Sequence, residues 1–516
     1  MTSAVVGPGR GFGARATIIL SGRDRGLEPR TLVAGLESIA LIGHPVARAH
    51  WSSSRRRSGV VEGGDDERHK DAAASGDIGA GLRRAWRRYP TQAAGPAPGG
   101  LSILPWLVCS LCVATRRAGL DVCGTGNGGC MSRTGVIQGL IVAMATLLSG
   151  CTHPPPISAP SGVELTPLRT VSRNEAQTLL SLAGVKGVPV RYDVDCYRMK
   201  YSALGPHGES VQLSGLLALP RGIAPRRLVS FQHGTTTTRD AVPSQPDQTG
   251  LAAAIAFGGS GYALIAPDYP GLGASTGRHP YYVADAVGPA IAAMIDAAER
   301  IPGVPKAPVF LSGFSEGGWA SLAAVRVLEA RGESVLGSAQ VAGAYDLRRV
   351  SLPAAMKGAA PQHALYLAYL AWAYADRYDH RLDSLLTPEY AAIVERLFSG
   401  GSTPDEIVKG LPANPRKLFN QAFLDAYDHD GSHWFLDAVA ANSLIDAAPR
   451  APLRLYYGSR DMDVAPGESR GAAQTMHARG ADVVAVDVGA VGHDASMLAA
   501  APRILAWLGA LDIAAK

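Results

Sequence analysis

One short segment of the chain has the residues and the spacing of a serine nucleophile. Ser315 is the centre of Gly-Phe-Ser-Glu-Gly, which follows the apolar run 309–312 and precedes a segment rich in Ala, Leu and Val. A strand, a tight turn and a helix in this order form a nucleophile elbow, in which a strained backbone presents the serine. Gly313 and Gly317 fit this interpretation, because side chains at these positions would collide with the neighbouring strand and helix. Ser315 is therefore the candidate nucleophile, with an ordinary glycine-rich turn as the alternative.

Two further motifs connect this elbow to a known architecture. The apolar run 228–232 leads into His233-Gly-Thr, and a later run ends in Asp268-Tyr-Pro-Gly-Leu-Gly-Ala-Ser. With the elbow, these motifs make residues 185–512 resemble an α/β-hydrolase of the secretory lipase and esterase branch. The resemblance implies an α/β fold with a mostly parallel central sheet, helices on both faces and a helical cap insertion. We expect Asp268 to be structural, holding its loop through backbone N–H groups.

The resemblance also implies an acid and a base for the serine. It assigns the acid to Asp461, in a Gly-x-x-Asp turn after an apolar run, with Asp463 as the alternative. It assigns the base to His493, in a loop after the last expected strand. Serine, acid and histidine then follow one another along the chain in the order of the family, each after a separate strand.

These residues imply acyl transfer that needs no metal and no organic cofactor. His493 would accept the proton of the serine hydroxyl and return it to the leaving group. In the family, the oxyanion hole takes one backbone N–H from the loop after the third strand and one from the residue after the nucleophile. The corresponding donors here are Thr235 or Gly234, and Glu316. We expect the ring of His233 to be buried and bonded to a loop carbonyl.

Residues 1–130 differ in composition from the rest of the chain. They contain sixteen Arg and one Lys against ten acidic residues, a net charge of +7, so the whole-chain charge of +5 leaves −2 for residues 131–516. The basic character therefore belongs to this leader, and nucleic-acid binding by the protein is not expected. We interpret residues 1–130 as an upstream extension without regular structure, outside the working protein, with a disordered arm as the alternative.

Residues 131–151 have the pattern of a bacterial lipoprotein signal peptide. Met131-Ser-Arg opens a short basic region, residues 135–148 are apolar and uncharged, and Leu-Ser-Gly-Cys151 resembles a lipobox. The apolar part is short for a membrane-spanning helix, although a transmembrane anchor is the alternative. We therefore expect acylation at Cys151, which would anchor the protein to a membrane of the bacterial cell envelope, the outer membrane or a periplasm-facing surface. A proline-rich tether and an N-terminal segment would follow in residues 152–184.

The catalytic domain is expected in two pieces, residues 185–346 and 449–516. Residues 347–448 separate them and show repeated helical periodicity without a convincing strand. The resemblance implies that this insertion is a cap over the active site. Aromatic side chains of the cap are expected to line the pocket, among them Tyr366, Tyr369, Trp372 and Tyr374.

The periodicity of the apolar residues predicts most of the regular elements. Alternating and buried apolar runs predict strands at 192–201, 211–219, 228–232, 262–266, 309–312, 337–344, 453–457 and 481–487. Helical spacing predicts helices after the elbow and at 177–182, 283–300, 364–378, 388–398, 404–409, 417–427 and 501–508.

Two clusters of potential metal ligands are interpreted without a metal. Four cysteines in the leader are spaced unlike a zinc module: Cys109, Cys112, Cys123 and Cys130. The sequence Asp-His-Asp-Gly-Ser-His at 428–433 is more typical of a polar turn that ends a helix.

Ester hydrolysis is the function that the resemblance implies, through a Ser-His-Asp triad and an acyl-enzyme, with a small-molecule or lipid ester as substrate. A serine peptidase of the prolyl-peptidase type is the alternative enzyme, since such peptidases share the triad and the Asp-x-x-Gly-x-Gly loop. A peptidase that selects a free N-terminus needs a carboxylate cluster near its pocket. A non-catalytic envelope lipoprotein that uses the fold for binding is the third alternative. The oligomeric state is not predicted.

Overall fold

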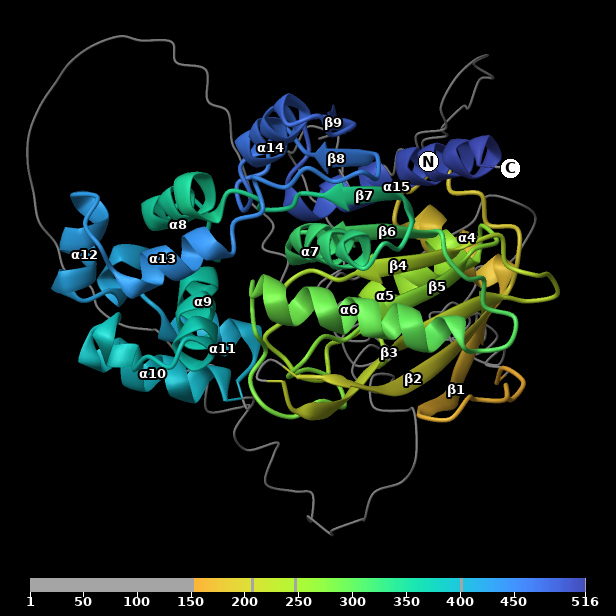
Figure 1. Ribbon diagram of the computed structural model, residues 1–516, viewed down its shortest axis with the longest axis horizontal. Coiled ribbons are helices and arrows are strands. Elements are labelled where there is room, and N and C mark those ends of the chain that lie inside the picture. The colour runs from red at the N-terminus through yellow and green to blue at the C-terminus, as the bar shows by residue number, and fades with distance from the viewer. Residues whose placement is uncertain (1–152, 206–207, 246–247, 400–401, 516) are drawn as a thin grey trace, which may run out of the picture. The chain divides into compact units, whose positions relative to one another are not determined.

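The computed structural model describes residues 153–205, 208–245, 248–399 and 402–515 (Figure 1). The expected leader, the signal segment and Cys151 lie outside the described residues. The strands, the helices and the candidate site discussed below all belong to the described part of the chain.

The described residues form a nine-stranded sheet (Figure 1). Its strands are β1 (Val163–Val171), β2 (Val194–Leu204), β3 (Ser210–Pro220), β4 (Leu228–Gln232), β5 (Ala263–Pro267), β6 (Val309–Phe314), β7 (Val335–Val341), β8 (Leu453–Tyr457) and β9 (Val483–Asp487). Their order is β1-β2-β3-β5-β4-β6-β7-β8-β9. The pairings from β1 to β5 are antiparallel, and those from β5 through β4 to β9 are parallel. The expected α/β class with a mostly parallel sheet is confirmed.

The sheet begins earlier in the chain than residue 185, where the sequence placed the start of the catalytic domain. β1 pairs antiparallel with β2, from Val163 opposite Tyr201 to Val171 opposite Val194. Pro167 interrupts the strand pattern, and the register shifts directly after it. A proline is tolerated here because β1 is an edge strand, where one row of N–H groups has no strand to pair with.

The buried strands pack against helices on both faces. In β6, Val309 and Leu311 belong to the core cluster that contains residues of α6 (Ala284–Glu299) and α7 (Glu316–Ala330). Phe310 belongs instead to the cluster on the other face, with residues of α15 (His493–Ala514). This alternation follows from the period of two along a strand. Figure 1 shows α6 and α7 side by side on one face of the sheet.

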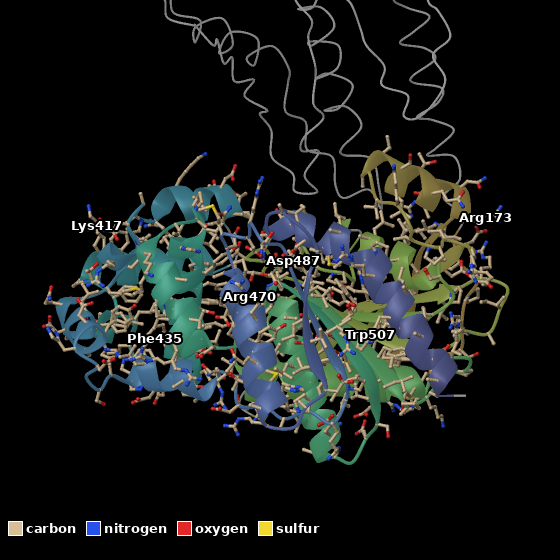
Figure 2. The ribbon with its side chains drawn as sticks, turned by 90° about the horizontal axis from the view of Figure 1, so that it is seen from above. Arg173, Lys417, Phe435, Arg470, Asp487 and Trp507 are labelled. Carbon is tan, nitrogen blue, oxygen red and sulfur yellow. The ribbon has the colours of Figure 1, made fainter. Side chains whose placement is uncertain are left out.

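The remaining helices of the sheet domain are short or lie near its last strands. They are α4 (Arg173–Leu182), α5 (Gln248–Ala253) with the π-helical turn η2 (Ala254–Gly258), and α14 (Pro466–Ala478). α14 packs against β8 and β9. In Figure 2, Arg470 marks α14, Trp507 marks α15, and Asp487 marks the end of β9 between them.

The chain between β7 and β8 is helical, as expected for the insertion. Its elements are η3 (Leu347–Ser351), α8 (Leu352–Lys357), α9 (His363–Arg377), η4 (Leu382–Ser384), α10 (Pro388–Phe398), α11 (Pro404–Gly410), η5 (Pro415–Leu418), α12 (Gln421–Asp428) and α13 (Trp434–Ala441). Several of its helices begin at a residue whose side chain caps the first turn. Thr403, for example, accepts a hydrogen bond from the Glu406 N–H, and the Glu406 carboxylate accepts one from the Thr403 N–H. Lys417 and Phe435 mark this insertion in Figure 2.

The last helix is longer than the predicted 501–508. α15 begins at His493, so this histidine lies at a helix N-terminus and not in a loop. Pro502 lies inside α15 and hides its extent in the sequence. By length and apolar composition α15 could cross a membrane, but it packs on β7 and β8. Its buried Asp512 also forms ion pairs with Arg226 and Arg227, as in a core helix.

Candidate active site

Ser315 lies on a strained turn between β6 and α7. Its φ of +56° and ψ of −120° place a non-glycine residue where L-residues are rare. Such a conformation costs on the order of 1–3 kcal/mol and persists only where the surroundings fix it. Here the Ser315 N–H donates to the carbonyl of Val341 in β7, at 2.8 Å. The turn therefore presents the hydroxyl at the carboxyl end of the parallel strands.

The two glycines of the elbow are required by close packing. A Cβ on Gly313 would lie 2.1 Å from the carbonyl oxygen of Gly317, in the first turn of α7. A Cβ on Gly317 would lie 2.0 Å from the carbonyl oxygen of Gln232, at the end of β4. The collisions expected from the sequence are thus confirmed, and they show how closely the helix approaches the sheet.

The structure brings Ser315, His493 and Asp461 into one hydrogen-bonded row. Nε2 of His493 lies 2.9 Å from Oγ of Ser315, and its Nδ1 lies 2.8 Å from Oδ2 of Asp461. The other carboxylate oxygen of Asp461 accepts the N–H groups of Asp463 and Val464, at 3.0 and 2.9 Å. Asp461 is therefore fixed by its own turn, and it holds the imidazole so that Nε2 faces the hydroxyl.

The surroundings of His493 favour its protonated form. Burial lowers the pKa of His493, but the hydrogen bond to Asp461 and the charges of Asp461, Asp463 and Asp494 outweigh burial and raise it above the usual 6.5. The ring also packs on Phe314, with 4.8 Å between ring centres. A histidine in this setting is well suited to hold a proton taken from Ser315.

Asp463, the alternative acid, forms no hydrogen bond with the histidine ring, whose two nitrogens face Asp461 and Ser315. Oδ1 of Asp463 accepts a hydrogen bond of 3.3 Å from the Tyr366 hydroxyl. The potential metal-ligand atoms of Asp461, Asp463 and His493 lie within 4.8 Å of one another, close enough to bind one metal ion together. Both ring nitrogens of His493 are already engaged, however, by Asp461 and by Ser315. A metal ion bound to His493 would have to replace one of these two hydrogen bonds.

The expected oxyanion-hole residues lie around Ser315. Glu316 is the first residue of α7, so its N–H belongs to the turn in which a helix leaves N–H groups unpaired. A Cβ on Gly234 would lie 3.4 Å from Cβ of Ser315, so the loop after β4 runs against the elbow. Thr235 lines the same pocket as Ser315. In the described part of the chain, neither the Thr235 N–H nor the Glu316 N–H donates to a backbone carbonyl outside its own helix or strand.

Sequence reasoning missed a buried pair beneath the elbow. Nε2 of His279 lies 2.8 Å from Oε1 of Glu316, and both side chains are 1% exposed. The other ring nitrogen, Nδ1, lies 2.9 Å from the carbonyl oxygen of Pro270 and must carry a proton, because a carbonyl only accepts. The pair ties the first residue of α7 to the loop before α6. No motif spacing signals it, since the two residues lie 37 positions apart.

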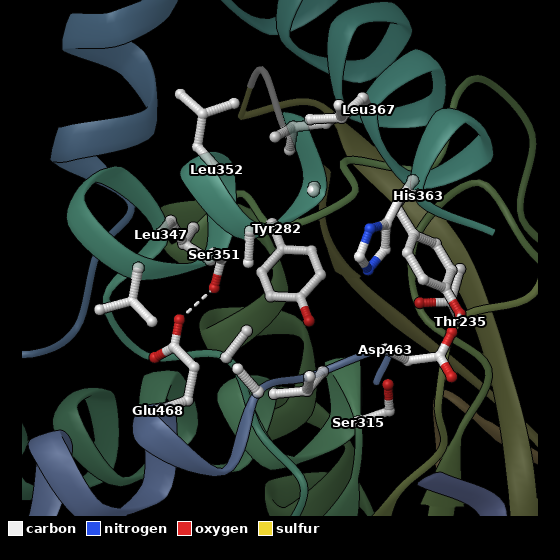
Figure 3. Close-up of a pocket in the computed structure, with 18 of the residues that line it drawn as sticks. Thr235, Tyr282, Ser315, Leu347, Ser351, Leu352, His363, Leu367, Asp463 and Glu468 are labelled. Carbon is white, nitrogen blue, oxygen red and sulfur yellow. Dashed lines mark hydrogen bonds between the residues drawn. The ribbon is translucent and has the colours of Figure 1, made fainter. Parts of the chain in front are cut away.

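A pocket of about 80 Å³ lies over Ser315, between the sheet and the insertion (Figure 3). The insertion supplies most of its apolar lining, including Leu347, Leu352, Leu367 and Leu370. This part of the chain therefore covers the candidate site, as expected for a cap.

The aromatic residues expected to line the cap divide into two groups. Tyr366 lines the pocket, but Tyr369, Trp372 and Tyr374 do not. They are buried in packing instead: Tyr369 stacks on Phe398, and the Tyr374 hydroxyl donates to the carbonyl of Tyr282. Helical spacing gave the correct helix, but the face that meets the pocket depends on how α9 is rotated.

A carboxyl group that the sequence analysis did not single out also lines the pocket. Glu468 of α14 is 2% exposed and accepts the N–H groups of Tyr345 and Asp346, both at 3.0 Å, and the hydroxyl of Ser351. Burial raises the pKa of Glu468 to about 7, against the lowering effect of these hydrogen bonds. Figure 3 shows Glu468 and Ser351 joined at one side of the pocket.

Two polar residues have the structural roles expected of them. The ring of His233 is buried, with Nδ1 2.7 Å from the carbonyl oxygen of Gly234. Asp268 is buried and accepts the Ser244 N–H at 2.9 Å and the Ser214 hydroxyl at 2.6 Å, which holds the loop after β5.

In the polar segment 428–433, α12 ends at Asp428 and the next helix begins at Trp434, so the segment is the turn between them.

Comparison with solved structures finds the same fold in other proteins. A protein of Legionella pneumophila subsp. pneumophila assigned as a hydrolase matches with 25% identity and a TM-score of 0.61, over 67% of this chain and 95% of its own. The rice cell wall degrading esterase LipA of Xanthomonas oryzae matches with 23% identity and a TM-score of 0.59, over 67% of this chain and 97% of its own. No protein-family model matches the chain, and no curated protein sequence matches it significantly.

Proposed function

We propose that this chain, which has the α/β-hydrolase fold, is a serine hydrolase that cleaves carboxylic esters. The observation that carries the proposal is the row formed by Ser315, His493 and Asp461, with hydrogen bonds of 2.9 and 2.8 Å. Three residues from three separate strand ends meet in the order that proton transfer requires.

In the proposed first step, Ser315 attacks the ester carbonyl while His493 takes its proton. The hydroxyl lies at hydrogen-bond distance from Nε2, and Asp461 keeps the proton of the neutral ring on Nδ1 and stabilises the imidazolium that forms. The N–H groups of Glu316 and Thr235 would bind the negative charge on the carbonyl oxygen, each contributing on the order of 3 kcal/mol. His493 then protonates the leaving alcohol, and an acyl group remains on Ser315.

Deacylation would use the same groups in reverse. Water replaces the alcohol, His493 removes its proton, and the tetrahedral intermediate breaks down to a carboxylic acid and free Ser315. The proton balance closes within the three residues, so the proposed chemistry requires no further group.

The pocket supports an ester rather than a peptide substrate. Ten of its 19 lining residues are Ala, Val or Leu, as suits an acyl or alkyl group. The Xanthomonas neighbour is an esterase, and we extend that reaction class to this chain as part of the proposal. A peptidase that selects a free N-terminus needs free carboxylates. Two carboxylates line the pocket. Glu468 accepts three hydrogen bonds from the protein, and Asp463 accepts one from Tyr366, so both are already engaged.

A substrate panel tests this proposal. Full-length protein is assayed with 4-nitrophenyl esters of graded acyl length and with a set of aminoacyl anilides, beside the Ser315→Ala variant. We expect hydrolysis of short esters, little cleavage of the anilides and loss of ester hydrolysis in the variant. Preferential cleavage of the anilides would instead establish a peptidase, and activity on neither class would support a binding protein.

We also propose that the protein is a lipoprotein of the bacterial cell envelope, acylated at Cys151. The support is the sequence alone: a basic start, an apolar segment and the Leu-Ser-Gly-Cys motif in residues 131–151. Stable anchoring requires more than one acyl chain, which lipoprotein modification supplies. The Cys151→Ser variant should lose the acyl groups, measured by palmitate labelling and by partition into detergent. Unchanged labelling in the variant would remove this proposal and leave the esterase proposal intact.

A further inference from the structure

The pocket over Ser315 contains polar side chains, and most of them are paired with one another. The Thr235 hydroxyl bonds to the Tyr281 hydroxyl at 2.9 Å, and the Tyr366 hydroxyl donates to Asp463. Ser351 donates to Glu468. In the described part of the chain, the lining residues left without a hydrogen-bond partner at a side-chain polar atom include His363, at the start of α9.

His363 presents a buried N–H to this pocket. The residue is 2% exposed, and its Nδ1 lies 3.5 Å from the N–H of Ala360, which is a donor. In the tautomer in which Nδ1 accepts this N–H, the ring proton lies on Nε2. Nε2 is buried and has no partner among the described residues. Figure 3 shows the ring pointing into the space that Ser315 also borders.

A second hydroxyl faces the same space. Tyr282 lines the pocket, and Figure 3 shows its hydroxyl directed towards the interior, between His363 and Ser315. Tyr282 has a φ of +55°, which is rare for an aromatic residue. Its carbonyl accepts the Tyr374 hydroxyl at 3.0 Å, and Trp319 packs on its ring, so surrounding residues hold the strained backbone. Strain maintained in this way is typical of residues that a binding site must position.

The two groups set a chemical requirement on whatever fills the pocket. A buried N–H without a partner is unfavourable unless a ligand supplies an acceptor. A purely aliphatic chain would leave the His363 N–H unpaired, whereas an ether, hydroxyl or carbonyl oxygen would accept from it. The Tyr282 hydroxyl can donate to the same oxygen or accept from a substrate hydroxyl.

The size of the pocket limits the group that binds. At about 80 Å³, where one water needs about 10–15 Å³ by the same measure, it has room for roughly five to eight water-sized positions. A compact group of a few carbon atoms with one oxygen fits without movement of the cap, whereas a long fatty-acyl chain does not.

We propose that His363, with Tyr282, recognises an oxygen atom in the substrate, so that this protein prefers esters of short oxygen-bearing groups to esters of plain alkyl chains. The inference rests on the proposed ester hydrolysis at Ser315 and adds the class of substrate. The oxygen-bearing group is either the acyl or the alcohol part of the ester, because both leave from the same carbonyl.

Matched ester pairs test the proposal. In the acyl arm, 4-nitrophenyl butanoate, pentanoate and hexanoate are compared with esters in which an ether oxygen replaces one methylene at position 3, 4 or 5. In the alcohol arm, the corresponding alkyl and oxa-alkyl acetates are compared. For each protein we measure the oxa-to-alkyl ratio, which is kcat/KM of an oxa ester divided by kcat/KM of its alkyl match. Comparing this ratio between the wild type and a variant removes the intrinsic reactivity of each ester.

The variants separate recognition from packing. His363→Phe keeps an aromatic ring but removes the donor, His363→Gln keeps a donor near Nε2, and Tyr282→Phe removes one hydroxyl. For at least one pair in one arm, we expect His363→Phe to lower the oxa-to-alkyl ratio about tenfold or more. We expect Tyr282→Phe to lower it less, and His363→Gln to restore part of it. The arm that responds identifies the part of the ester that enters the pocket.

Equal losses for the oxa and alkyl esters in every pair of both arms would overturn the proposal, since His363 would then act only through packing. A binding measurement distinguishes this result from a failure of the esterase proposal, because it does not require catalysis. Anilides of the same alkyl and oxa-alkyl acyl groups, in which an amide replaces the ester, are titrated by calorimetry into Ser315→Ala, with and without His363→Phe. A preference for the oxa anilide that His363→Phe removes supports recognition even if the wild type cleaves no ester. No preference in either measurement overturns it.

Discussion

Asp461 and Asp463 lie in the same turn but have different hydrogen-bond partners. Asp461 bonds to the ring, whereas Asp463 lies two residues later and accepts from Tyr366. The sequence favoured Asp461 but kept Asp463 as the alternative, because both lie in the same short turn and a shift of two positions changes no pattern of apolar residues. Only the backbone path decides which side chain turns towards α15.

This difference predicts unequal effects of two similar substitutions. Asp461→Asn should lower kcat on the order of 10⁴-fold, because an amide no longer fixes the tautomer and the charge of the ring. Asp463→Asn, the matched control, should lower it less than about tenfold. Steady-state kinetics on one 4-nitrophenyl ester measures both effects, and the reverse ranking would move the acid to Asp463.

The charges around His493 predict how activity depends on pH. The base must be neutral to accept a proton, so activity falls as pH drops through the pKa of His493, which is raised above the usual 6.5. Asp494 is one of the carboxylates that raise it. Asp494→Asn removes a negative charge that favours the imidazolium, so the acid limb of kcat/KM should move to lower pH. A pH profile of wild type and variant measures this, and a shift to higher pH would contradict the assignment.

At the scale of elements, one side chain of α14 fastens the start of the insertion to the sheet. Glu468 accepts the N–H groups of Tyr345 and Asp346 after β7 and the hydroxyl of Ser351 in η3. Although these hydrogen bonds lower the pKa of Glu468, burial outweighs them, so an acid with a raised pKa lies at the base of the cap. The pKa of Glu468 is about 7 in the folded state, against a usual value near 4.5. Between pH 4.5 and 7, Glu468 is therefore protonated in the folded state and ionised in the unfolded state.

This buried acid predicts a loss of stability as pH rises. Stability from the protonated Glu468 is fully present below pH 4.5 and is lost between pH 4.5 and about 7, by about 3 kcal/mol over the full shift. Glu468→Gln keeps a carbonyl for the two N–H groups and an amide for Ser351, and it cannot ionise. Urea unfolding at pH 5 and pH 8 should show a smaller pH effect in this variant than in the wild type. An equal pH effect in both proteins would contradict the shift.

Elements with a clear period were predictable from the sequence, and elements masked by proline were not. β4 and β8 were predicted to the residue, because they are short apolar runs bounded by polar turns. β1 was missed because Pro167 breaks its alternation, and α15 was shortened because it contains Pro502. In both cases tertiary packing holds an element whose local pattern is weak.

At the scale of the whole molecule, the order of the strands explains why the site forms where it does. β6, β8 and β9 run parallel in the same half of the sheet, so the loops after them meet at one edge. Ser315, Asp461 and His493 each follow one of these strands, which is why motif order alone could place them together. No comparable rule predicts which residues of the insertion and of α14 meet at this edge of the sheet. His363 and Glu468 could therefore be identified only from the folded chain.

The central claim is that Ser315 is the activated nucleophile, and active-site labelling measures this most directly. Full-length protein is treated with a fluorophosphonate, and the modified peptide is identified by mass spectrometry, with heat-denatured protein and Ser315→Ala as controls. We predict one adduct per chain, on Ser315, formed as ester hydrolysis is lost, and a fall in activity on the order of 10⁴-fold or more in Ser315→Ala. An adduct on another serine, or more than a tenth of the activity in Ser315→Ala, would contradict the claim.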